Sequence, residues 1–322
     1  MLERACSFGR ETRKNLMGVL TLPIGDKRRE VALIFVNAGV LHRVGPYRLY
    51  VELARRLASV GFATLRFDLS GLGDSELPVD DLNELERAVV DVQAAMDYLQ
   101  QQYSFDRFVL LGLCSGADDA LSSAVADARV VGAVLLDGFG FRTAGFYRRH
   151  YLARALQPKK VLAFLSRQVK NATSLAALKA LQHPGKGAAS AGSPAGAALD
   201  IFDRQFPPAS VVAGHLSRLA KRGAKLLFIY SGGSGYFNHE RQFAEMFPAP
   251  ELAQCADVHF LGPADHTYTV LADRESLVCH IEAWLGRRFS ELEVSQTPPS
   301  TRRRSHRSSA PPASSSKERI VF

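Results

Sequence analysis

Short apolar runs and longer amphipathic segments alternate along most of this chain. The apolar runs are typical of buried strands, and the segments between them place apolar side chains three and four residues apart, as on one face of a helix. Strands are expected at 15–22, 31–36, 62–67, 130–136, 225–230 and 257–261, and helices just after Pro46, at 82–99 and at 270–285. This alternation predicts an α/β fold with a mostly parallel central sheet and helices on both of its faces.

The alternation is interrupted once and stops before the C-terminus. Residues 142–219 have helical character, broken by a loop rich in Gly, Ala and Ser at 185–196. Beyond Ser290 the chain consists largely of Ser, Pro and Arg, with almost nothing to bury, which predicts disorder. We therefore expect a core at 1–141 and 220–290, a helical cap insertion at 142–219, and a disordered basic tail at 291–322.

The most informative stretch is the Gly-Leu-Cys-Ser-Gly motif at 112–116, between a short apolar run and an Ala-rich amphipathic segment. A nucleophile elbow is a sharp strand-to-helix turn, and it needs small residues two positions before and two after the nucleophile. With Cys114 at the centre, these positions hold Gly112 and Gly116. With Ser115 at the centre, they would hold a leucine and an alanine. The spacing therefore selects the thiol of Cys114 as the candidate nucleophile.

The order of these elements, followed by a late Asp265-His266 pair, resembles that of the α/β-hydrolases over about residues 5–288. A narrower similarity points to the serine-aminopeptidase-type hydrolases, especially the subgroup found beside bacterial exopolysaccharide and exosortase systems. It is carried by Asn37-Ala-Gly39 with Arg43-Val-Gly-Pro46, Arg66-Phe-Asp-Leu-Ser-Gly-Leu-Gly-Asp-Ser75, Gly112-Leu-Cys-Ser-Gly-Ala117 and Ala264-Asp-His-Thr267. The superfamily says little about the substrate, because one fold hosts many chemistries.

The resemblance implies a role for each motif. Cys114 would attack an acyl carbonyl, helped by the positive end of the helix that follows it. His266 would act first as general base and then as acid toward the leaving group. The oxyanion hole would use two backbone N–H groups, those of Ser115 and Gly39, and Ser115 is expected to contribute nothing else.

The acid that would orient His266 departs from the usual pattern. The superfamily usually carries it after the strand at 225–230, but there the chain has no carboxylate until Glu240. Asp137, which ends the preceding strand, is the better candidate, and Glu240 is the alternative. Asp265 adjoins His266 in sequence and is expected to hold the loop instead, because neighbouring side chains usually diverge.

Charge is distributed unevenly. The chain carries a net charge of +8, yet residues 138–199 hold ten Lys or Arg and no acid, and residues 287–322 hold eight Lys or Arg and three acids, which leaves the rest at −7. One interpretation is that the cap cations form solvated helix faces. The sharper hypothesis is that they attract an anionic acyl donor, such as an acidic carrier protein, a phosphorylated thioester or an acidic saccharide ester. Arg148 and Arg149 are the candidate substrate contacts.

Other features narrow the class of protein. The four cysteines, Cys6, Cys114, Cys255 and Cys279, show neither metal-ligand spacing nor a disulfide framework, which favours a reduced, cytoplasmic setting. No apolar run approaches the roughly 20 residues of a membrane span. We expect no metal, no cofactor and no specific nucleic-acid partner.

Two classes of function fit these observations. The first is a hydrolase or acyltransferase that acts on an ester or thioester through an acyl-cysteine. The second is a non-catalytic α/β-hydrolase fold that binds a ligand or a partner. The pattern does not indicate an oligomeric state.

Overall fold

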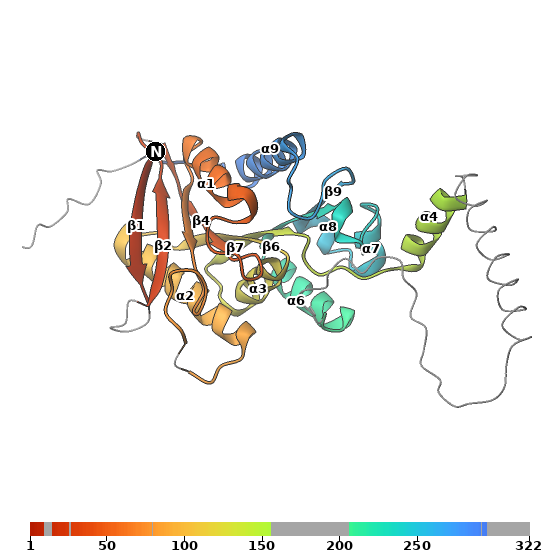
Figure 1. Cartoon of the computed structure of the whole chain (residues 1–322), viewed down its shortest axis with the longest axis horizontal. Helices are drawn as coiled ribbons and strands as arrows, with labels where there is room; N and C mark the ends of the chain where they lie inside the picture. Colours follow the sequence, from red (N-terminus) through yellow and green to blue (C-terminus); the bar gives the residue numbers. More distant parts are fainter. Residues whose placement is uncertain (10–14, 26, 79, 156–205, 291, 295–322) are drawn as a thin grey trace, which may run out of the picture.

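The structure is a computed structural model that describes residues 1–9, 15–25, 27–78, 80–155, 206–290 and 292–294. Eight of its strands form one sheet in the order β1-β2-β5-β4-β6-β7-β8-β9 (Figure 1). Their bounds are β1 Leu2–Phe8, β2 Leu16–Leu22, β4 Val31–Val36, β5 Ala63–Phe67, β6 Arg107–Leu113, β7 Val130–Leu136, β8 Lys225–Ser231 and β9 Ala256–Leu261. From β5 through β9 in the sheet order, every neighbouring pair is parallel, whereas β2 pairs antiparallel with both β1 and β5. The predicted α/β-hydrolase fold with a mostly parallel sheet is therefore confirmed.

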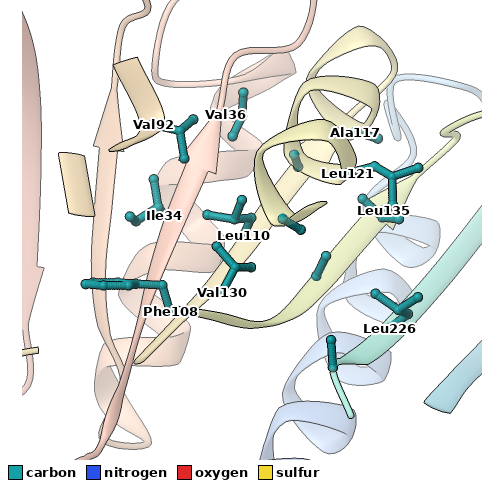
Figure 2. Packing of buried hydrophobic residues seen from close by; sticks show 14 of the residues in the cluster. Ile34, Val36, Val92, Phe108, Leu110, Ala117, Leu121, Val130, Leu135 and Leu226 are labelled. Atoms are coloured by element: carbon teal, nitrogen blue, oxygen red, sulfur yellow. The ribbon is translucent and has the colours of Figure 1, made fainter. Parts of the chain in front are cut away.

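Helices cover both faces of this sheet because the central strands are apolar on both sides. One core cluster lies between the sheet and α2 (Glu84–Tyr103), α3 (Ser115–Ala126) and α6 (Ala209–Lys221). Figure 2 shows part of it, including Phe108 and Leu110 of the sheet and Leu121 of α3. The second cluster lies between the sheet and α1 (Leu49–Ser59) and α9 (Leu271–Arg288). In Figure 1 these two sets of helices lie on opposite sides of the strands.

The carboxyl ends of parallel strands lie at the same edge of a sheet, and the residues of the site lie at this edge. The turns after β6, β7, β8 and β9 all leave from it, so segments distant in sequence become neighbours there. Short helices lie in the connections: η1 (Pro46–Arg48) precedes α1, η2 (Gly232–Ser234) follows β8, and α7 (Gln242–Met246) and α8 (Leu252–Cys255) lie between η2 and β9.

The peripheral elements extend the sequence prediction. Strand β1 was not expected, because most of its side chains are exposed and it lacks an apolar run; its pairing with β2 along the whole strand defines it. Of the predicted cap, the structure describes α4 (Ala144–Ala155) and most of α6, while 156–205 lie outside the described residues. Within the predicted tail, β10 (Leu292–Val294) pairs with β3 (Lys27–Arg29), and 295–322 lie outside the described residues.

Candidate active site

The turn between β6 and α3 has the geometry that its glycines predict. Cys114 adopts φ 59° and ψ −124°, a left-handed conformation that non-glycine residues rarely take. A Cβ on Gly112 would lie 2.0 Å from the carbonyl oxygen of Gly116, and a Cβ on Gly116 would lie 2.1 Å from that of Asn37. Both contacts are impossible, so each position must be glycine. The strained residue between them is Cys114, not Ser115.

The hydroxyl of Tyr50 in α1 holds the start of this turn through hydrogen bonds to the backbone. Its fully buried hydroxyl donates to the carbonyl oxygen of Val36 (3.0 Å) and accepts from the backbone N–H of Leu113 (3.0 Å). It therefore joins the last residues of β4 and β6. A Cβ on Gly45 would lie 2.8 Å from the Tyr50 ring, so this glycine admits the tyrosine. Tyr50 lies in the helix expected just after Pro46, but nothing in the sequence indicates the partners of its hydroxyl.

His266 and Asp137 meet at the same edge. The Nδ1 atom of His266 lies 2.8 Å from Oδ2 of Asp137, although 129 positions separate the two residues. The Asp137 carboxylate is fully buried and also accepts from the backbone N–H of Ser231 (2.7 Å) and from its hydroxyl (2.6 Å). Asp137 itself has φ 46°, held in part by Tyr236, whose hydroxyl donates to the Asp137 carbonyl oxygen (2.7 Å).

The charges around His266 favour its protonated form. The hydrogen bond to Asp137 comes first, and a hydrogen bond to Cys114 comes second; against the opposing effect of burial, they raise the pKa of His266 to about 10. Negative and hydrogen-bonding partners favour the positively charged imidazole over the neutral one, which is why its pKa rises. The three predicted residues Cys114, His266 and Asp137 are therefore brought together, with the imidazole in the middle.

The loop that carries His266 is held from two directions. Asp265 accepts from the backbone N–H and hydroxyl groups of Thr267 (both 2.8 Å) and from the backbone N–H of Thr269 (2.9 Å). Burial alone would raise the pKa of Asp265, but these hydrogen bonds lower it well below its usual range. On the other side, a Cβ on Gly233 would lie 2.4 Å from the backbone nitrogen of His266. Asp265 thus orders the loop, as the sequence suggested.

The alternative acid occupies a different place. Glu240 is exposed, accepts from the backbone N–H of Phe260 (3.3 Å) and lies 4.0 Å from Nδ1 of His259. The only carboxylate within hydrogen-bond distance of His266 among the described side chains is that of Asp137. The geometry therefore favours Asp137.

The loop after β4 lies beside the elbow. The backbone N–H of Gly39, a residue with φ 55°, donates to the hydroxyl of Ser115 (3.0 Å). Sequence reasoning paired these two residues through their backbone N–H groups, and the structure adds a side-chain contact that it had not foreseen.

Asp68 organises this loop from the end of β5. Its fully buried carboxylate accepts from the backbone N–H groups of Arg43 (2.6 Å) and Asp74 (3.1 Å) and from the side-chain amide of Asn37 (3.3 Å). The Arg43 guanidinium forms ion pairs with Asp68 and with Asp74. The Asp68 motif therefore positions the loop that carries Gly39 and lies beside the site as a support.

The two candidate substrate arginines differ. Arg149 already has carboxylate and amide partners: Glu245 of α7 at 2.8 Å and Asn238 at 3.0 Å. These contacts tie α4 to α7. Arg148 is exposed.

No helix in the described ranges is both long and apolar enough to span a membrane. No three His, Cys, Asp or Glu side chains in this part of the chain are grouped so that they would hold a metal ion.

The comparisons with known proteins define the class. The model of the alpha/beta hydrolase family matches residues 33–293, which is most of the chain. The chain therefore belongs to the alpha/beta hydrolase family. A search of curated proteins found no match.

Solved structures show the same fold at low sequence identity. The alpha/beta hydrolase GrgF from Penicillium sp. sh18 is 17% identical with a TM-score of 0.55, covering 90% of this chain and 100% of its own. An esterase from Pyrococcus furiosus is 16% identical with a TM-score of 0.54, covering 90% and 91%. An a/b serine hydrolase without lid from Xanthomonas campestris is 14% identical with a TM-score of 0.52, covering 90% and 96%. Each is similar to this chain in fold alone.

Proposed function

We propose that this protein is a cysteine hydrolase that cleaves acyl esters or thioesters, with Cys114 as nucleophile, His266 as general acid and base, and Asp137 as the orienting acid. The observation that carries the proposal is the position of the His266 imidazole, whose Nδ1 lies 2.8 Å from the buried Asp137 carboxylate and whose pKa is raised by both Asp137 and Cys114. The family supports a hydrolase, and the glycine contacts at 112 and 116 support the thiol as its nucleophile.

The first half of the reaction forms an acyl-enzyme. The Cys114 thiolate attacks the acyl carbon, and the carbonyl oxygen becomes negative in the tetrahedral intermediate. When the bond to the leaving group breaks, the protonated Nε2 of His266 gives its proton to the departing alcohol or thiol. Asp137 holds Nδ1–H throughout and keeps Nε2 directed at the reacting atoms.

The second half releases the acid. Neutral His266 accepts a proton from water, which attacks the carbonyl carbon of the acyl-cysteine. The bond between that carbon and Sγ breaks, the carboxylic acid leaves, and the thiolate and imidazolium are restored. Each turnover therefore consumes one water and leaves the enzyme unchanged.

An acyltransferase uses the same first half with an alcohol, thiol or amine in place of water. The fate of the acyl group therefore distinguishes the two activities. The third candidate, a binding protein of the same fold, predicts no acyl-cysteine at all.

We also propose that the basic cap selects anionic acyl donors, with Arg148 as an exposed, described cation that can act on them. Arg149 is already paired with Glu245, so it is the matched control. A field from exposed cations acts mainly on association and weakens with salt. Arg148→Glu should lower kcat/KM for an anionic ester about threefold to tenfold at low salt and leave a neutral ester of the same acyl group unchanged. An equal effect on both esters at both salt concentrations would remove charge selection from the proposal.

The finer family assignment belongs to the same proposal. The motifs at 37–46, 66–75, 112–117 and 264–267 resemble the serine-aminopeptidase-type hydrolases associated with exopolysaccharide and exosortase systems. A cytoplasmic location fits a nucleophilic thiol, which an oxidising compartment would inactivate.

The test of the nucleophile is its reactivity compared with the other cysteines. Iodoacetamide at pH 6 should alkylate Cys114 first, because the adjacent His266 imidazolium keeps its sulfur as thiolate. Cys279 is the matched control, since it is exposed but beside Glu275, which raises the pKa of its thiol. Peptide mass mapping reads the order. Equal labelling of Cys114 and Cys279 would favour the binding-protein alternative.

A further inference from the structure

The hydroxyl of Ser115 lies where the oxyanion hole is expected, and half of its hydrogen-bonding capacity is already fixed. Its Oγ accepts the backbone N–H of Gly39 at 3.0 Å, across 76 positions of sequence. Within the described part of the chain, no acceptor receives the proton of this hydroxyl, and the side chain is half-buried. The Ser115 O–H is therefore oriented by one neighbour and still available to donate to another.

The backbone of Gly39 has one hydrogen-bond donor, its N–H, and this N–H donates to the Ser115 hydroxyl. In this arrangement the Gly39 N–H does not reach an acyl oxygen directly. Gly39 has φ 55°, and nothing lies within 4 Å of a Cβ built on it, so glycine is needed for the backbone conformation that aims this N–H and not for lack of space.

We propose that the Ser115 side-chain hydroxyl, oriented by the Gly39 N–H, is the second oxyanion donor of the acyl-transfer site. Ser115 then supplies two donors to one oxygen. Its backbone N–H lies in the first turn of α3, where N–H groups have no partner within the helix, and its O–H lies beside it. The hydrogen bond from Gly39 makes the hydroxyl a stronger donor, because hydrogen bonds in a chain polarise one another.

This inference rests on the proposed function, because an oxyanion forms only if Cys114 attacks an acyl carbonyl. It departs from the sequence expectation, in which Ser115 offers only its backbone N–H and Gly39 donates directly. The two arrangements predict opposite results for Ser115→Ala. If the Ser115 hydroxyl donates to the oxyanion, this variant loses a donor. If Gly39 donates directly, this variant frees the Gly39 N–H to bind the oxyanion.

The experiment compares the wild type with Ser115→Ala, Ser115→Thr and Ser122→Ala, using p-nitrophenyl acetate carrying ¹³C at the carbonyl. Steady-state kinetics gives kcat and KM, and infrared difference spectra give the carbonyl band of the acetyl-Cys114 adduct. Ser115→Ala should lower kcat about 10²-fold with little change in KM, since one oxyanion donor contributes at least this much. Its carbonyl band should move to higher frequency, because the bond is less polarised.

Ser115→Thr keeps a hydroxyl and should retain most of the activity and the wild-type band, while Ser122→Ala, on the same helix, should match the wild type. The proposal is overturned if Ser115→Ala keeps wild-type kcat and band, or if Ser115→Thr is as impaired as Ser115→Ala. If the wild type forms no adduct on Cys114, the proposed function fails and this inference fails with it. If the wild type forms the adduct and Ser115→Ala behaves identically, only this inference fails.

Discussion

Strands β7 and β8 are paired neighbours that end at the same edge of the sheet, yet the residues that follow them differ in kind. After β7 comes Asp137, a buried carboxylate with positive φ that faces His266. After β8 come Gly232 and Gly233, where any side chain would collide: a Cβ would lie 2.0 Å from the Gly262 carbonyl oxygen in one case and 2.4 Å from the His266 backbone nitrogen in the other.

The contrast shows how the acid can occupy the earlier strand. The loop bearing His266 packs directly onto the β8 turn, because the first two residues of that turn are glycines. The close approach leaves no room there for a carboxylate beside the imidazole, and it brings the ring over the end of β7. Ser231, the last residue of β8, holds the Asp137 carboxylate in place with two hydrogen bonds, one from its backbone N–H and one from its hydroxyl.

The largest effect should come from Asp137→Asn, which we expect to lower kcat on the order of 10⁴-fold, as for the same change in a catalytic triad. Asparagine has one acceptor oxygen where Asp137 presents two. Its NH2 group would then face either Ser231 or Nδ1 of His266, and at His266 it would favour the tautomer without a proton on Nδ1. Steady-state ester hydrolysis measures the loss of kcat. Activity within threefold of the wild type would break the assignment.

The same variant should move the pH dependence. In the wild type the pKa of His266 is raised to about 10, first by Asp137, so kcat/KM should hold until the imidazolium is lost near that pH. Without Asp137 the alkaline limb should fall at lower pH. The raised pKa also stabilises the folded state fully below about 6.5, and this contribution is lost as pH rises toward 10. Urea unfolding at several pH values reads the second effect.

Gly233→Ala should have the next largest effect, and it tests whether the close packing at the β8 turn sets the position of His266. The new methyl group must push the backbone of His266 away, and a displacement of about 1 Å can cost about 10²-fold in rate. Overpacking should also lower the free energy of unfolding by about 1–3 kcal/mol. Gly214→Ala is the control, since nothing lies within 4 Å of its Cβ. Wild-type kcat in Gly233→Ala would show that the β8 turn does not set the histidine position.

Ser231→Ala should have a smaller effect. It deletes one of the two hydrogen bonds that Ser231 gives to Asp137 and keeps the backbone N–H. A hydrogen bond to a charged group contributes about 1.5–3 kcal/mol, most of it here to stability, so kcat should fall no more than about tenfold. Parallel kinetics and thermal unfolding separate the two. A loss as large as that of Asp137→Asn would make Ser231 an equal partner.

Glu240→Gln should have the smallest effect, below about twofold in kcat, because an exposed carboxylate whose neighbours are a backbone N–H and the His259 ring contributes little. The same ester assay applies. If this variant were slower than Asp137→Asn, the acid would belong to the β8 side and the comparison would be reversed.

Much of the fold followed from local patterns. Apolar runs located the central strands, and the order of strands and helices identified the parallel sheet. Strand β1 escaped because a solvent-facing edge strand carries no apolar run, and only its pairing with β2 defines it. The elbow register was predictable because close backbone packing at Gly112 and Gly116 is a rule about spacing.

The contacts that support the site could not be predicted from the sequence, because they join residues far apart along the chain. The Tyr50 hydroxyl between β4 and β6, the Ser231 donors to Asp137 and the Glu245 partner of Arg149 depend on which side chains the tertiary fold turns toward each other. A residue type can suggest that it hydrogen-bonds, but only the packed structure gives its partner.

The most direct test of the central claim is to trap the acyl-enzyme. The chain would be mixed with a p-nitrophenyl ester, quenched in acid within the first turnover, and analysed by intact mass and peptide mapping. We predict one acyl group per chain, on Cys114, absent in Cys114→Ala and formed far more slowly in His266→Gln. An acyl group on Ser115, or release of p-nitrophenol by Cys114→Ala at the wild-type rate, would contradict the account.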